Sequence, residues 1–262
     1  MNAPGRPDPG QEIRCSVIEL RQYTLHPGQR DVLIELFDRE FVETQEAVGI
    51  SVIGQFRDQG DPDRFVWVRG FPDMRARAEA LTAFYVEGDA WRRHRDAAVA
   101  TMVDSDDVLL LRPVGAAPGL PPGSARPSAG AGEPPASRVM VTIYHREPPI
   151  APADPRQPVD DDFAVFFRDR VAPVMTETGA RPLACFQTEP AENTYPALPV
   201  RTGENVFVWF AAFPDAADHA EHGRLLDRSR TWTEEVLPEL SARLICPPRH
   251  LTLTPTARSR LR

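Results

Sequence analysis

The sequence predicts an α+β protein built from two tandem ferredoxin-like repeats, each with the element order βαββαβ. Three observations support this prediction. The segment Phe65–Asp73 (FVWVRGFPD) returns as Phe207–Asp215 (FVWFAAFPD), and six of the nine residues are identical. Residues 113–137, between the copies, are rich in Pro, Gly, Ala and Ser, as linkers are. Strand-like and helix-like patterns follow one another in the same order on both sides of that linker.

The length of 262 residues and the 42% hydrophobic content suffice for two cores of ordinary domain size. We therefore expect five segments along the chain. They are a disordered N-terminus (1–14), a first domain (15–112), a flexible and poorly packed linker (113–137), a second domain (138–254) and a frayed basic tail (255–262).

The first copy begins with a strand in which polar and apolar side chains alternate. Gly28 and Gly49 bracket the helix that follows, and aromatic and aliphatic residues give this helix an apolar stripe. In order, the expected elements are a strand (Val17–Tyr23), a helix (Gln29–Ala47), two strands (Ile50–Phe56 and Phe65–Arg69), a helical region (Met74–Thr101) and a strand (Val108–Leu111).

The second copy repeats this order. Pro173 and Pro238 should kink or end the helices that contain them, because proline lacks the amide hydrogen that a helix needs. The expected elements are a strand (Arg138–Tyr144), a helix (Asp161–Glu177), two strands (Leu183–Thr188 and Val206–Ala211), helices within Asp215–Ala242 and a strand (His250–Thr254).

Composition excludes several classes of function. The net charge of −8 argues against a nucleic-acid partner, which requires a cationic face. All 30 basic residues are arginine, so neither a Schiff-base lysine nor a phosphate-loop lysine is available. The sequence also lacks the glycine-rich dinucleotide motif and the hydrolase motif GxSxG.

The same sequence indicates a cytoplasmic protein without a membrane segment. No apolar run approaches the roughly 20 residues of a membrane span, and the polar N-terminus has no secretion signal. The three cysteines lack CxxC spacing, which favours a reducing compartment. His219 and His222 stand three residues apart but have no evident third ligand, so we expect no metal and no organic cofactor.

Candidate site residues lie on two strands of the first copy. Alternate residues of a strand share a face, so Glu19, Arg21 and Tyr23 form one polar row. The neighbouring strand carries Trp67 and Arg69 in the same way. If the two strands are adjacent, these side chains converge.

The second copy has lost the charges but kept the aromatic groups. Its corresponding rows are Met140, Thr142 and Tyr144 on one strand, and Trp209 and Ala211 on the other. Positions that keep their charge in one copy only are those at which the roles of the copies have diverged. We therefore expect the functional pocket in the first copy.

Each candidate residue has a functional and a structural interpretation. Arg21 and Arg69 can hold a carboxylate or an oxyanion, Tyr23 can orient it, and His94 can transfer a proton. Trp67 can stack on a ring, and Glu19 can complete the site. The alternative is that Glu19 forms a structural ion pair with one of the arginines among core aromatic residues, and that His94 is an exposed surface residue.

The segment Glu19–Gly28 (ELRQYTLHPG) resembles the opening strand and turn of NIPSNAP domains, and the Phe65–Trp67 strand and Trp91 helix fit the same pattern. The resemblance implies a dimeric α/β barrel, with both halves supplied here by one chain. Relatives of that fold include cofactor-free monooxygenases, lactone isomerases, polyketide cyclases, aldoxime dehydratases and haem enzymes.

The preferred function is a cofactor-independent enzyme of the isomerase, cyclase, dehydratase or monooxygenase type, acting on a small aromatic or enolisable molecule in bacterial specialised metabolism. Tyr144 and Trp209 would supply apolar walls from the second copy, and the two-repeat chain could form a homodimer. The alternative is a non-catalytic small-molecule-binding or protein-interaction module. Haem binding would require an axial histidine, which the sequence does not identify.

Overall fold

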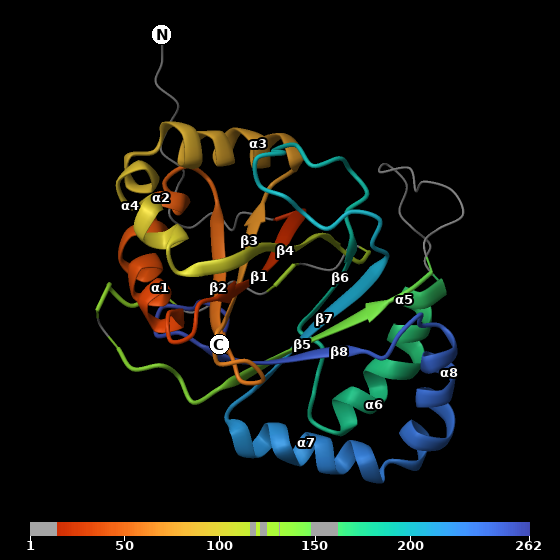
Figure 1. Ribbon diagram of the computed structural model, residues 1–262. Coiled ribbons are helices and arrows are strands. Elements are labelled where there is room, and N and C mark those ends of the chain that lie inside the picture. The colour runs from red at the N-terminus through yellow and green to blue at the C-terminus, as the bar shows by residue number, and fades with distance from the viewer. Residues whose placement is uncertain (1–14, 116–118, 121–124, 131, 148–161) are drawn as a thin grey trace.

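The computed structural model describes residues 15–115, 119–120, 125–130, 132–147 and 162–262 (Figure 1). The protein is a mixed α/β fold around a closed barrel of eight antiparallel strands, in the order β1-β3-β2-β8-β5-β7-β6-β4. Among the described residues, no helix combines the length and the apolar character that crossing a membrane requires. The segment 1–14, expected to be disordered, lies outside the described residues.

The first half of the chain contains β1 to β4 and the helices between them. Asp73 caps α3, because its carboxylate accepts a hydrogen bond from the amide of Ala76 at 2.7 Å. The elements are β1 (Val17–Leu25), α1 (Arg30–Leu36), a π-helical turn (Phe37–Phe41), α2 (Val42–Glu46), β2 (Ser51–Asp58), β3 (Arg64–Phe71), α3 (Met74–Thr82), a π-helical turn (Ala83–Glu87), α4 (Asp89–Val99) and β4 (Met102–Pro113).

The second half has the same order of elements, and Asp215 caps α7 as Asp73 caps α3. This shared role explains the repeated Phe-Pro-Asp. The elements are β5 (Arg138–His145), α5 (Asp162–Phe166), a π-helical turn (Phe167–Val171), α6 (Ala172–Glu177), β6 (Ala184–Thr188), β7 (Val206–Phe213), α7 (Ala216–Arg228), a π-helical turn (Thr231–Val236), α8 (Leu237–Ala242) and β8 (Arg249–Pro255).

Pro173 and Pro238 do not end their helices. Each stands in the first turn of a new helical segment, α6 or α8, directly after a π-helical turn. In a π-helical turn the amide hydrogens bond five residues back, so the hydrogen-bond pattern shifts there and the helix continues through a residue that has no amide hydrogen.

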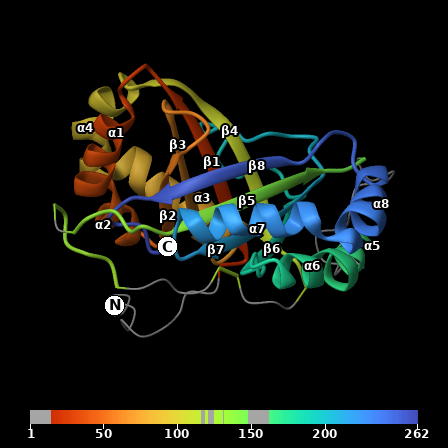
Figure 2. The same cartoon turned by 90° about the horizontal axis from the view of Figure 1, so that it is seen from below.

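The two halves close the barrel at two joints. Strand β2 pairs with β8 through Phe56–Pro255, and β4 pairs with β6 through Leu111–Thr188. The interior is mainly apolar and contains side chains from both halves, such as Leu20, Val68, Val141 and Val208. The helices cover the outside, with α1, α2 and α4 at one end of the view and α5, α6 and α8 at the other (Figure 2).

Each half therefore has a second core between its own helices and the outer face of its own strands. The row that contains Glu19, Arg21 and Tyr23 belongs to this outer face in the first half, because the alternate residues Ile18 and Leu20 point into the barrel. Any site built on that row consequently lies between sheet and helices, rather than inside the barrel.

The tail, and the part of the linker around Arg126 that the structure describes, pack more tightly than the sequence suggests. Arg126 is nearly buried and donates a hydrogen bond to the carbonyl of Val52 at 2.6 Å. The tail was expected to be frayed, but Ser259 is fully buried and Leu261 donates its amide hydrogen to the carbonyl of Ile53 at 3.0 Å. Backbone pairing with β2 holds the tail in place, and basic side chains reach acceptors of the first half.

Candidate functional site

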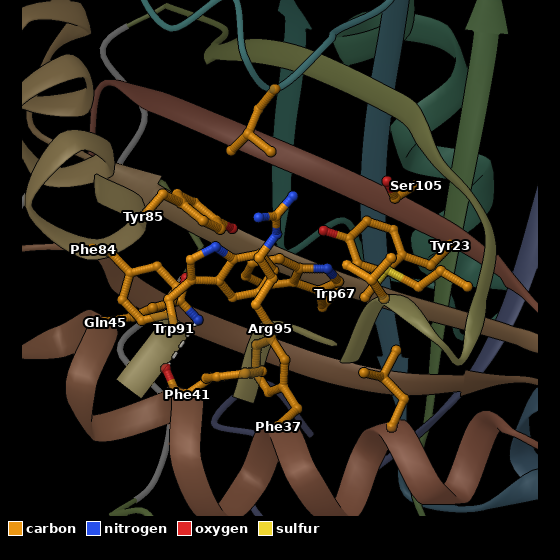
Figure 3. A pocket seen from close by; sticks show the side chains of 14 residues that line it. Tyr23, Phe37, Phe41, Gln45, Trp67, Phe84, Tyr85, Trp91, Arg95 and Ser105 are labelled. Carbon is orange, nitrogen blue, oxygen red and sulfur yellow. Dashed lines mark hydrogen bonds between the residues drawn. The ribbon is translucent and has the colours of Figure 1, made fainter. Parts of the chain in front are cut away.

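A cavity of about 190 Å³ lies between the outer face of the first half's strands and its helices (Figure 3). Residues from β1 and β3 form its floor, and residues from the helices form its sides. The lining residues are Tyr23, Leu33, Phe37, Phe41, Gln45, Trp67, Phe84, Tyr85, Trp91, Arg95, Val99, Met102, Ser105 and Leu198.

Half of the lining residues are aromatic, and several of their rings pack edge to face. Trp67 on β3 contacts Tyr23 and Phe37, with ring centroids 6.0 and 4.8 Å apart. On the helical side, Tyr85 contacts Trp91 at 4.9 Å. T-shaped contacts are a preferred arrangement of aromatic rings, and the ring faces that line the cavity suit a flat apolar ligand.

A buried charge cluster lies behind the floor of the cavity. Glu19 accepts hydrogen bonds from Arg21 Nη1 at 2.7 Å, Arg69 Nε at 2.7 Å and Arg77 Nε at 2.6 Å. All four side chains are buried, at 1% exposure or less. Burial alone would raise the pKa of Glu19, but the three guanidinium groups together hold that pKa well below its usual range, so the carboxylate is charged.

One carboxylate cannot balance three guanidinium groups, so the cluster carries two surplus positive charges. Within the described part of the chain, Arg69 Nη2 and Arg77 Nη2 have no hydrogen-bond partner. A buried positive surplus is costly unless an anion or a polar acceptor approaches it. The cluster therefore favours negative charge in the adjacent cavity.

Two tyrosine hydroxyls connect the cluster to the cavity. Arg21 Nε donates to the hydroxyl of Tyr23 at 3.0 Å, and Arg69 Nη1 donates to the hydroxyl of Tyr85 at 3.2 Å. Each hydroxyl is thus an acceptor toward an arginine, and its own hydrogen remains available to a ligand. Burial raises the pKa of Tyr23, an effect that Arg21 partly offsets, so this phenol stays protonated at neutral pH.

Arg95 adds a third donor at the mouth of the cavity. Figure 3 shows its guanidinium pointing toward the hydroxyls of Tyr23 and Tyr85. Trp91, Arg95 and Val99 occupy positions i, i+4 and i+8 of α4 and form one stripe that faces the cavity. Arg95 is exposed and has no hydrogen-bond or ion-pair partner among the described residues.

The candidate residues from the sequence fall into two groups. Tyr23 and Trp67 line the cavity, whereas Arg21, Arg69 and Glu19 lie behind its floor and act on it through the tyrosines. Sequence reasoning missed Arg95, although its position four residues after Trp91 on the same helix was a signal that could have found it. Tyr85 and Arg77 carry no such signal, because nothing in the sequence relates their helices to the polar row.

His94, expected to transfer protons, does not line the cavity. Its Nε2 faces Glu40 Oε2 at 3.4 Å, and its ring lies against Phe41 at 6.4 Å between centroids. The reason is the helical period, which turns His94 about 100° away from its neighbour Arg95. Among the described residues, no group of three His, Cys, Asp or Glu side chains could hold a metal ion.

Tyr144 and Trp209, expected to form walls of the same pocket, lie elsewhere. Both belong to the core between the second half's own strands and helices, because they share the outer face of the second sheet. There Met140 faces Ala211 across β5 and β7, where the first half has Glu19 facing Arg69. The second half thus has an apolar core at the place where the first half has the charge cluster.

Comparisons with known proteins found a family model that matches part of the sequence and solved structures with a similar fold. Residues 18–118 match the model of the NIPSNAP family. No curated protein matches the chain. A candidate monooxygenase from Fusobacterium nucleatum is similar in structure, with a TM-score of 0.55, 8% identity and 94% of each chain covered.

Two further solved structures share the fold. An anthrone oxidase-like protein has a TM-score of 0.52 and 12% identity, covering 92% of this chain and 91% of its own. The encapsulated DyP-type peroxidase from Mycobacterium smegmatis has a TM-score of 0.51 and 12% identity, covering 96% of each chain. Proteins with different names share this architecture, so the function has to be argued from the site.

Proposed function

We propose, starting from the NIPSNAP domain at residues 18–118, that this protein is an enzyme whose first-half cavity binds a small aromatic or enolisable molecule and stabilises it as an oxyanion. The observation that carries the proposal is the pair of tyrosine hydroxyls. Tyr23 and Tyr85 each accept a hydrogen bond from a buried guanidinium and can donate their own hydrogen to one ligand oxygen.

The chemistry follows from where the charge develops. When an enolisable carbon or a phenolic hydroxyl gives its proton to water at the mouth of the cavity, the electron pair comes to rest largely on oxygen. Two oriented O–H donors beside a positively charged cluster stabilise that oxygen more than they stabilise the neutral molecule. Isomerisation, cyclisation, dehydration and oxygenation by dioxygen each have variants that pass through such an anion, and the structural likeness to a protein named as a monooxygenase favours the last type.

The size of the cavity limits the substrate. A volume of about 190 Å³ is a little larger than the roughly 150 Å³ of an engineered apolar cavity that holds benzene. The site suits a flat molecule of one or two rings, stacked against Trp67 and Trp91. Arg95 at the mouth would hold a carboxylate or a second oxygen of that molecule.

We further propose that the second half is a diverged copy of the first, with a mainly structural role. The identical order of elements and the corresponding caps at Asp73 and Asp215 support this relationship. A cytoplasmic location, a place in bacterial specialised metabolism and a homodimer of the whole chain also remain proposals from the sequence.

The oxyanion proposal can be tested with 4-nitrophenol, because only the phenolate of this probe is yellow. The absorbance of the bound probe should show that its pKa is lower than in water. Tyr23→Phe and Tyr85→Phe should each move the bound pKa back toward its value in water. Tyr144→Phe is the matched control, since it removes the corresponding hydroxyl from the second half and should leave the bound pKa unchanged.

Turnover separates an enzyme from a binding module. The ketonisation of phenylpyruvate, which is small, aromatic and enolisable, can be followed by the absorbance of its enol, and dioxygen uptake can be recorded with 1-naphthol. We expect one of these activities to be lost in Tyr23→Phe and kept in Tyr144→Phe. Binding of the phenolate without any turnover would favour the non-catalytic alternative.

A further inference from the structure

The connection between β6 and β7 lies over the cavity of the other half of the chain. It contains 17 residues, 189–205, whereas the corresponding connection between β2 and β3 contains five, 59–63. Figure 1 shows it as the teal loop beside α3. Two backbone hydrogen bonds to β4 fix its ends, Glu189 N to Leu110 O and Arg201 N to Val108 O, both at 2.9 Å.

Asn193 joins this long connection to the charge cluster. Arg77, which pairs with Glu19, also donates through Nη1 to Asn193 Oδ1 at 2.9 Å and to Thr194 Oγ1 at 3.2 Å. Thr194 in turn donates to the carbonyl of Met74 at 3.0 Å. One guanidinium thus links the buried carboxylate of the first half to a loop of the second.

Asn193 also fixes the shape of the loop. Its Oδ1 accepts from the amide of Tyr195 at 3.0 Å, and its Nδ2 donates to the carbonyl of Leu198 at 2.9 Å. Leu198 lines the cavity, and the ring of Tyr195 lies against that of Tyr85 at 6.2 Å between centroids. The position of this part of the wall therefore depends on the side-chain amide of Asn193.

We infer that Asn193 is a positioning residue through which the second half of the chain sets the size of the ligand that the first half's cavity accepts, with Leu198 as the contact that excludes larger rings. The inference rests on the proposed function, because it concerns the same cavity. It assigns the second half a role in ligand selection, in addition to closing the barrel.

Calorimetry with benzoate, 2-naphthoate and anthracene-2-carboxylate, and with their neutral amides, tests the inference. Leu198→Ala should shift the preference between two-ring and three-ring probes by about tenfold or more toward three rings, as the removal of pocket groups does. Asn193→Asp keeps the acceptor for Arg77 and Tyr195 but loses the donor to Leu198, and it should shift the preference in the same direction. Leu183→Ala, a half-exposed leucine of the second half outside the cavity, should not.

A measurement without ligand keeps the two proposals separate. In a Trp232→Phe background, Leu198→Ala and Asn193→Asp should make Trp91 more accessible to quenching by acrylamide, and Leu183→Ala should not. Unchanged quenching and an unchanged ring preference in both variants would overturn the inference. A wild-type protein that binds acids and amides equally would contradict the oxyanion proposal alone, since ring preference is read within each series.

Discussion

Glu19 and Arg69 face each other across β1 and β3, and their side chains form an ion pair with Oε2 and Nε 2.7 Å apart. The corresponding residues of the second half, Met140 and Ala211, face each other across β5 and β7 in the same register. The chain therefore offers an internal comparison, in which one sheet carries buried charges and the other carries apolar groups at corresponding positions.

We expect Glu19→Gln to lower the free energy of unfolding by about 3–5 kcal/mol, because it leaves three buried guanidinium groups without their counter-charge. Chemical denaturation at neutral pH measures this loss. Met140→Leu, at the corresponding site of the second half, should cost less than about 1.5 kcal/mol, as exchanges of similar volume do. Similar losses in the two variants would show that the charges of the cluster are not the cause.

Arg95→Ala should weaken the binding of 2-naphthoate by about 1–3 kcal/mol, which is typical of a lost charge-assisted hydrogen bond. Since Arg95 is exposed, its removal should leave the midpoint of thermal unfolding almost unchanged. Arg92→Ala, on the same helix but paired with Asp89 at the surface, is the control and should bind normally. The prediction fails if both variants bind the acid as the wild type does.

The stability of the protein between about pH 4 and pH 6 should depend on Asp38. Burial raises the pKa of this carboxyl to about 6, although Arg258 and Arg126 oppose the rise. A carboxyl with a raised pKa holds its proton more tightly in the folded state, so stability falls as pH rises through this window. The fall attributable to Asp38 should be about 2–3 kcal/mol.

Asp38→Asn should remove that part of the pH dependence, as measured by urea denaturation at several pH values. Asp96→Asn, on the exposed face of α4, provides the comparison and should keep the wild-type slope. Below about pH 4.5, the free energy of unfolding of both variants should instead decrease as the pH falls. Glu19 has a lowered pKa, so the stability it contributes is lost as pH falls below its unfolded value.

Arg126→Ala should release the linker from the first half and speed its cleavage by subtilisin, which does not require a basic residue. The guanidinium of Arg126 binds the carbonyls of Val52 and Arg258 and the carboxylate of Glu46, and alanine supplies none of these contacts. We expect a stability loss of about 1–3 kcal/mol. Arg75→Ala, at an exposed ion pair on α3, should change neither cleavage nor stability.

The sequence predicted strands and helices well where the apolar residues recur with a clear period and where a capping residue marks the end of an element. The strand expected at Val17–Tyr23 is β1, two residues longer, and the helix expected over Gln29–Ala47 contains α1, a π-helical turn and α2. The tail is short and basic, which predicted a frayed end. That prediction was wrong, because backbone hydrogen bonds to β2 hold the tail in place. Such pairing has no local signature in the sequence.

The site was predictable only where it lies on strands. The alternation of β1 correctly put Glu19, Arg21 and Tyr23 on one face, and the repeat pointed to Trp67 beside them. Arg77 reaches the same carboxylate from α3, 58 positions along the chain. Contacts of this kind depend on how helices are laid over the sheet, which one sequence without homologues does not specify.

Both joints of the barrel lie within a single polypeptide, and this affects how the sequence of each half can diverge. In a barrel assembled from two identical subunits, every substitution appears twice, so a second buried cluster of three arginines and one glutamate would accompany the first. Here a mutation alters one side only. The buried charges of the cluster are therefore confined to one half, while the corresponding positions of the other half carry apolar groups.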